Sequence, residues 1–249
     1  MTAANSLACA CLWLLASLGH AEPLIKPTAI DWLLDCPLPH IERLDPEVLE
    51  RTQCGIVTVP RNHAAPRQGS LRLYVTRVGA REPLNRAGLV FAQAGGASKK
   101  NMGGTFAIHL ASRWGATSTQ AHRRLLNYFD VIELSPRDLR QENGVEQAAL
   151  DMEFVRAQLG DSLLHYVGNA DAARLGNRYG ALFPERVARM VLVNAERGEK
   201  ASALVEQLYL KEPVNPGASG CVNQWAGDFL AYGKQPPAST RCLDSGDWE

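Results

Sequence analysis

The sequence predicts an α/β fold built on a doubly wound, mostly parallel sheet. Four short apolar runs carry this prediction: Gly88–Gln93, Phe129–Leu134, Leu163–Gly168 and Arg189–Ala195. Continuous apolar runs of this length are typical of strands that are covered on both faces. Segments with helical spacing separate the later runs, and strand–helix–strand repetition favours parallel pairing.

Two further strands are predicted before these runs. Residues Cys54–Pro60 and Ser70–Val78 are rich in β-branched and apolar residues, and the turn RNHAAPRQG between them contains Pro and Gly. This pattern indicates a β-hairpin. The preceding residues, 22–53, are rich in proline at first and are expected to form an extended N-terminal arm.

Two helices are predicted between the later strands. In Gly144–Gly160 the apolar residues recur at helical spacing, and the final glycine suits a helix end. A second helix, closed by Pro184, is expected at Asp171–Leu182, between the third and fourth apolar runs. Residues 54–199 therefore form the predicted α/β core.

Residues 200–249 differ in character and are expected to form a partial cap-like segment. The stretch ASALVEQLYL predicts a helix, and CVNQWAGDFLAYG predicts another after a Pro-, Gly- and Ser-rich stretch. No further buried strand is expected here, so the sheet is predicted to lack its last strands. The strand at Arg189–Ala195 would then be an open edge, which could pair with a protein partner.

The composition excludes two classes of partner. Lysine and arginine together number 26, as do aspartate and glutamate, so no charge excess favours binding to nucleic acid or to an anionic membrane.

The N-terminus predicts an export signal over residues 1–21. Leu7–Leu18 is apolar throughout but short for a bilayer span, and small Gly19 and Ala21 precede a cleavage point before Glu22. The segment before it, MTAANS, has no Lys or Arg, and the alternative is a buried N-terminal helix. With the signal removed, we expect a periplasmic or secreted protein without membrane association.

Four cysteines remain after the signal: Cys36, Cys54, Cys221 and Cys242. An even number in an exported chain favours disulfides. Three pairings are open, and proximity favours Cys36–Cys54 with Cys221–Cys242. Neither pair has the spacing of a zinc site, so no metal is expected.

Four stretches carry a resemblance to a known family. They are CGIVTVPRNH with SLRLYVTRV, LVFAQAGGAS, YFDVIELSPRD, and the long segment ALDMEFVRAQLGDSLLHYVGNADAARLGNRYGALFPERVARMVLVNA. Between Cys54 and Ala195 the chain resembles an α/β-hydrolase, and more narrowly the secreted tripeptidyl-aminopeptidase and proline-iminopeptidase branch of serine peptidases. The resemblance implies a serine nucleophile on a sharp turn between a strand and a helix.

The chain departs from this pattern at the positions of the catalytic nucleophile and histidine. Tyr166, Gly168, Leu175 and Gly176 match the family's turn, but Ala170 occupies the place of the serine. A methyl group has no lone pair that could attack a carbonyl. In this family the histidine follows the nucleophile, whereas all six histidines here precede Ala170. The resemblance therefore implies a hydrolase-like protein that we expect to be inactive.

The loop that supplies oxyanion donors in the family is also altered. Gly95 and Gly96 remain and are interpreted as a remnant of that loop, while Ala94, Ala97 and Ser98 replace proline or glycine. The glycines lack the spacing of a phosphate-binding loop, so no cofactor is expected. In SPRD, Ser135 and Asp138 replace the family's aspartate and glycine.

Several alternatives stay open. Asp171 follows Ala170 and could act as a nucleophile, although its position equally suits the start of the next helix. A partner could supply a missing base to an active peptidase or esterase. The remnant crevice could instead bind a peptide or a small acyl ligand, and the open edge could serve an interaction protein.

Overall fold

The computed structural model describes residues 30–94, 104–117, 119–135, 137–141, 143–195, 201–211 and 219–237. The strands in this part are β1 Asp31–Trp32, β2 Thr52–Pro60, β3 Ser70–Val78, β4 Gly88–Gln93, β5 Phe129–Leu134, β6 Leu164–Asn169, β7 Val187–Val193 and β8 Gln207–Leu210. The helices are α1 Pro46–Glu50, α2 Phe106–Ala116, α3 Gln120–Tyr128, α4 Gly144–Gln158, α5 Asp171–Leu182 and α6 Ser219–Tyr232, with 3-10 turns at Ile41–Arg43, Pro83–Asn85 and Pro184–Arg186. The predicted signal peptide and the loop with Gly95 and Gly96 lie outside the described residues.

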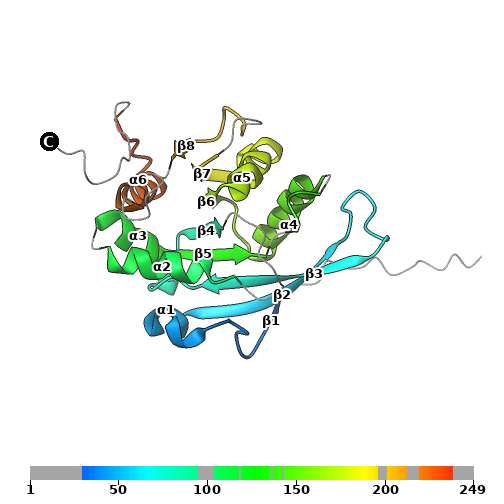
Figure 1. Ribbon diagram of the computed structural model, residues 1–249, viewed down its shortest axis with the longest axis horizontal. Coiled ribbons are helices and arrows are strands. Elements are labelled where there is room, and N and C mark those ends of the chain that lie inside the picture. The colour runs from blue at the N-terminus through cyan, green and yellow to red at the C-terminus, as the bar shows by residue number, and fades with distance from the viewer. Residues whose placement is uncertain are drawn as a thin grey trace, which may run out of the picture.

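The described strands form one sheet in the order β1-β2-β3-β5-β4-β6-β7-β8. The pairs β1/β2, β2/β3 and β3/β5 are antiparallel, and the pairs from β5 through β4, β6 and β7 to β8 are parallel. This mostly parallel sheet with helices on both faces confirms the predicted fold class (Figure 1).

Each face of the sheet carries its own hydrophobic core. On one face α4 and α5 pack against side chains such as Phe91, Leu134 and Tyr166. On the other face α2, α3 and α6 cover side chains such as Val131 and Val191, as Figure 1 shows. Burial on both faces explains why the parallel strands have continuous apolar sequences.

The helix that follows β4 lies on the opposite face from the helix that follows β6 (Figure 1). The chain therefore leaves the carboxyl ends of these two neighbouring strands in opposite directions. Such a point in an open α/β sheet creates a crevice, and ligands of such sheets bind there. The turn at Ala170 lies at this place, because it joins β6 to α5.

The predicted elements of the core are confirmed, with boundaries that differ by a few residues. The hairpin is β2 and β3, the four apolar runs are β4 to β7, and both predicted helices are present as α4 and α5. The helix predicted after residue 220 is α6. No element is predicted for residues 105–128, which form α2 and α3.

The predicted open edge at Arg189–Ala195 is wrong. β8 pairs in parallel with β7, from Met190 opposite Gln207 to Val193 opposite Leu210. The stretch predicted as a helix instead turns at Ser202, whose carbonyl oxygen accepts a 3.0 Å hydrogen bond from the Val205 N–H. Good helix formers adopt a strand here because the free backbone groups of β7 offer partners and Leu208 becomes buried.

The predicted disulfide between Cys36 and Cys54 is confirmed, with the Cα atoms 5.1 Å apart. It attaches the N-terminal arm to β2, where β1 also pairs. Cys221 is disulfide-bonded as well, and Cys242, its expected partner, lies outside the described residues. Among the described helices none is long and apolar enough to cross a bilayer.

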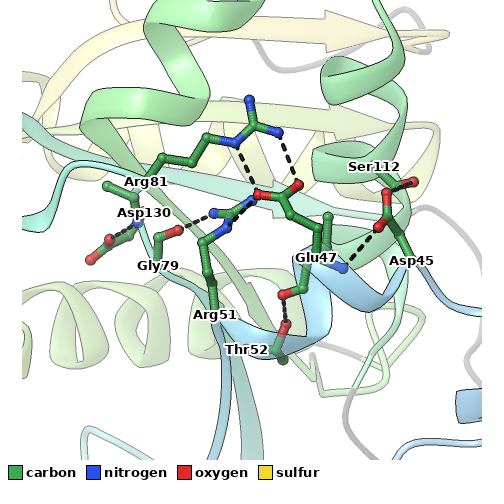
Figure 2. Close-up of polar contacts among 10 residues, drawn as sticks. Asp45, Glu47, Arg51, Thr52, Gly79, Arg81, Ser112 and Asp130 are labelled. Atoms are coloured by element: carbon green, nitrogen blue, oxygen red, sulfur yellow. Dashed lines mark hydrogen bonds and ion pairs between the residues drawn. The ribbon is translucent and has the colours of Figure 1, made fainter.

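A polar network fixes α1 at the amino end of β2 (Figure 2). Glu47 accepts hydrogen bonds from Arg51 at 3.1 Å and from Arg81 at 3.0 and 2.9 Å. Asp45 caps α1 through the Glu47 N–H and also accepts a 3.0 Å bond from Ser112 of α2. The hydrogen bond from Arg81 is the main reason why the pKa of Glu47 is lowered. This network lies at the end of the sheet where β2 begins, whereas the turn at Ala170 follows the carboxyl end of β6.

The packing of α5 on β6 positions that turn. The buried ring of Tyr166 lies between Gly168 and Gly176, and its hydroxyl donates a 2.6 Å hydrogen bond to the Ala172 carbonyl. A Cβ atom added at Gly168 would lie 2.7 Å from Tyr166 Cε1, and one at Gly176 would lie 2.4 Å from the same atom. Both glycines are therefore required for this close approach of helix and strand.

We expect Gly176→Ala to lower the free energy of unfolding by about 3 kcal/mol, because the added methyl also meets Leu192 and the core cannot relax freely. Gly220→Ala is the matched control, since nothing lies within 4 Å of a Cβ there, and it should stabilise α6 slightly. Urea denaturation of both variants measures the difference. Equal stability of the two variants would contradict the packing described here.

Candidate functional site

The turn between β6 and α5 has the geometry of a nucleophile elbow, but it presents a methyl group. Ala170 has φ 51° and ψ −116°, and its side chain is exposed. Its N–H donates a 3.0 Å hydrogen bond to the Val193 carbonyl of β7. A non-glycine residue in such a conformation is strained, and strain of this kind is found where the surrounding structure imposes it.

Asp171, the alternative nucleophile, lies in the first turn of α5. The N-cap position belongs to Ala170 and no side chain caps the helix, so Asp171 favours the helix start through its charge alone. Its described partner is Arg174, at 3.9 Å between Oδ1 and the guanidinium. In the described part of the chain no histidine bonds to Asp171, so nothing there would activate it.

Two of the described histidines, His122 and His165, are buried and pack against neighbouring elements. His122 is fully buried in α3, and its Nε2 lies 3.1 Å from the Asn223 carbonyl oxygen of α6. His165 of β6 meets Phe129 edge to face, with the ring centroids 5.1 Å apart. Burial lowers the pKa of His165 to about 4, with a smaller contribution from Arg189, so its imidazole is neutral at neutral pH. Neither ring has a described hydrogen bond to the turn at Ala170.

A histidine–aspartate pair lies elsewhere at the carboxyl edge of the sheet, and the sequence did not reveal it. His63 Nε2, in the turn after β2, lies 2.7 Å from Oδ1 of buried Asp151 in α4. The His63 N–H also donates a 2.8 Å bond to Gln147. In a catalytic triad the acid bonds Nδ1 of the histidine and Nε2 faces the nucleophile, whereas here Nε2 itself bonds Asp151. Its described hydrogen bonds lead to α4, so the pair fixes the hairpin rather than serving Ala170.

Arg137, in the SPRD stretch, has a structural role. Its guanidinium binds Asp151 at 2.5 and 2.9 Å and donates to the carbonyl oxygens of Pro60 and Arg61. The residue therefore joins the end of β5, the hairpin and α4. Ser135 has a structural role too, since its Oγ accepts a 2.8 Å bond from the Tyr74 N–H.

Glu133 is a buried carboxyl that sequence reasoning missed. It lies on β5, and its Oε2 accepts a 2.9 Å hydrogen bond from the Ala107 N–H in the first turn of α2. Burial raises its pKa to about 7, although the N–H groups of Ala107 and Phe106 act in the opposite direction. An acidic residue inside the apolar run FDVIEL was the signal in the sequence. The amino end of α2 is thus already occupied by a carboxyl group of the protein itself.

A crevice opens beside the turn at Ala170, between α2 and α6 and above the ends of β6 and β7. It contains about 540 Å³ of space not filled by atoms, part of it open to solvent. It is lined by Phe106, Leu110, Arg113, Trp114, Val167, Gly168, Asn169, Val193, Val222, Asn223 and Ala226. Among the residues described by the structure, no three His, Cys, Asp or Glu side chains converge as a metal site requires.

Sequence comparison finds hydrolytic relatives that are longer than this chain. A tripeptidyl aminopeptidase of Streptomyces coelicolor is 26% identical over 211 residues, which cover 66% of this chain and 36% of the relative. The serine protease Hip1 of Mycobacterium tuberculosis is 40% identical over 52 residues, 21% of this chain and 10% of that protein. The chain has an α/β-hydrolase-like fold, a mostly parallel sheet with helices on both faces. It spans about a third of the length of the aminopeptidase, and no family model matches it.

Comparison with solved structures gives distant matches. Cfl2 of Burkholderia cenocepacia aligns at 15% identity with a TM-score of 0.41, covering 76% of this chain and 55% of that one. A juvenile hormone epoxide hydrolase of Bombyx mori aligns at 13% identity with a TM-score of 0.42, covering 59% and 36%.

The strain at Ala170 can be measured. We expect Ala170→Gly to raise the free energy of unfolding by about 1 kcal/mol, because glycine adopts a positive φ without steric cost. Ala157→Gly is the control, since this exposed alanine lies in α4 and the same change should cost about 1 kcal/mol there. A loss of stability in Ala170→Gly would contradict the strained geometry of the turn.

The buried carboxyl predicts a dependence of stability on pH. The folded protein keeps the Glu133 proton up to about pH 7, whereas the unfolded chain releases it near 4.5. Unfolding therefore releases a proton between these values, and the free energy of unfolding falls as the pH rises through this window. The ionised form costs about 3 kcal/mol above pH 7.

We expect Glu133→Gln to be more stable than the wild type at pH 8, by about 1 to 3 kcal/mol, and nearly equal to it at pH 4. The glutamine oxygen can still accept from the Ala107 N–H. Glu50→Gln changes the same group at an exposed position of α1 and should show no such dependence. Urea denaturation at both pH values decides; a pH-independent effect of Glu133→Gln would contradict the raised pKa.

Proposed function

We propose that this protein is a hydrolase-fold protein that lacks covalent serine-hydrolase chemistry and uses its crevice for binding. One observation carries the proposal: the exposed side chain at the strained turn is the methyl group of Ala170. That turn normally presents a nucleophilic oxygen above the sheet. Without an oxygen or sulfur there, no acyl-enzyme can form at this position.

The narrower relationship is also part of the proposal. The match to a tripeptidyl aminopeptidase and the residues around the turn support descent from secreted serine exopeptidases. Export to the periplasm or the medium is consistent with the Cys36–Cys54 disulfide, because such bonds persist in oxidising compartments. The apolar N-terminal segment supports the same localisation.

An active hydrolase is the competing function. It would require Asp171 as a nucleophile, or a nucleophile and a base supplied by a partner. Asp171 has Arg174 as its described partner and projects from the first turn of α5 rather than from the strained position. The geometry therefore favours binding without turnover.

An activity-based probe tests this proposal. We expect a fluorophosphonate, which reacts with activated serines, to leave the wild-type protein unlabelled because position 170 has no hydroxyl. Peptide p-nitroanilides and p-nitrophenyl esters should likewise show no turnover above the rate in buffer. The Ala170→Ser variant is tested beside the wild type.

Turnover by the wild type would overturn the proposal, and its loss in Asp171→Asn would identify the nucleophile. Labelling of Ala170→Ser alone would show that the nucleophile was the missing group and that a base is available. The absence of labelling and turnover in both proteins, each verified as folded by circular dichroism, would be consistent with a site that only binds.

A further inference from the structure

We propose that the crevice between α2 and α6 binds a carboxylate that carries an apolar tail, such as a medium-chain fatty acid. This inference deepens the proposed function, because it names the class of ligand for the crevice beside Ala170. It rests on three features of the lining: apolar walls, one unpaired cation and one buried donor without an acceptor.

The walls of the crevice are apolar on three sides. Phe106 and Leu110 come from α2, Val167 and Val193 from the sheet, and Val222 with Ala226 from α6. Each methylene group of an aliphatic chain that is buried there favours binding, because apolar surface is removed from water. The crevice has about 540 Å³ of unfilled space, part of which is open to solvent. The walls therefore select for an apolar tail.

Arg113 gives the crevice a positive charge. Its side chain is exposed and makes no hydrogen bond or ion pair in the described part of the chain. Among the described residues that line the crevice there is no Asp or Glu. A guanidinium without a carboxylate partner at the edge of an apolar crevice favours an anionic group over an amine, and it binds carboxylates through paired N–H donors.

Trp114 supplies a buried hydrogen-bond donor, its indole N–H. The residue lines the crevice and is only 1% exposed, yet its Nε1–H has no acceptor. A buried donor without an acceptor costs free energy, and a ligand oxygen that accepted from it would recover that cost. An apolar ligand without oxygen atoms would leave the donor unpaired, so the crevice favours a ligand with acceptor atoms.

The first test compares three small probes by isothermal titration calorimetry. Octanoate has the proposed chemistry, octanamide keeps the chain without the charge, and N-acetyl-leucine presents the carboxylate as a peptide C-terminus would. We expect octanoate to bind at least tenfold more tightly than octanamide. Tighter binding of N-acetyl-leucine than of octanoate would assign the same carboxylate chemistry to a peptide end.

Two variants connect the affinity to the residues. Arg113→Gln should weaken octanoate binding about five- to tenfold and leave octanamide unchanged. Arg123→Gln is the matched control, because Arg123 is an exposed arginine of α3 that does not line the crevice. Trp114→Phe keeps an aromatic ring but removes the indole N–H, and it should weaken octanoate binding about threefold. The signal that disappears from its ¹H–¹⁵N spectrum is the indole N–H signal of Trp114.

In the wild type, octanoate should move the Trp114 indole signal downfield as the N–H gains an acceptor. Equal affinity for octanoate and octanamide, or an equal effect of the Arg113 and Arg123 variants, would overturn the proposal. So would the absence of binding at millimolar concentrations by a protein whose unfolding is cooperative. These outcomes do not depend on hydrolysis, so turnover by the wild type would overturn the proposed function while leaving the ligand class intact.

Discussion

The close packing of Tyr166 between Gly168 and Gly176 is the constraint on which the rest of the site depends. The ring lies directly under the turn, and its hydroxyl holds the Ala172 carbonyl in the first turn of α5. With helix and strand fixed in this way, the single residue between them has little freedom. Ala170 therefore keeps a positive φ although its side chain no longer needs to be presented.

The residues around the turn at Ala170 are held by close packing. Tyr166, Gly168 and Gly176 hold α5 on β6, and Arg137 joins β5, the hairpin and α4 through Asp151. The side chain of Ala170, at the turn itself, is exposed and takes no part in this packing. Packing is constrained by many neighbours at once, whereas the methyl of Ala170 projects into solvent and no neighbour requires an oxygen there.

The polar groups of the crevice are side chains of α2 and do not belong to the turn at Ala170. Glu133 already occupies the amino end of α2, so the positive end of that helix does not serve a ligand. Arg113 and Trp114 lie further along α2, where the described structure provides no partner for the guanidinium or the indole N–H. Binding at this site would therefore depend on the side chains of α2 rather than on the turn.

The sequence by itself determined the α/β class, the six strands from β2 to β7, the helices α4 and α5 and the presence of alanine at the turn between β6 and α5. These features follow from local hydrophobic periodicity and from one residue in a recognisable turn. Only the tertiary structure decided that Gln207–Leu210 is a strand, because its stability comes from pairing with β7. The same holds for the burial of Glu133, the His63–Asp151 pair and the crevice between α2 and α6, which join residues far apart in the chain and have no local signal.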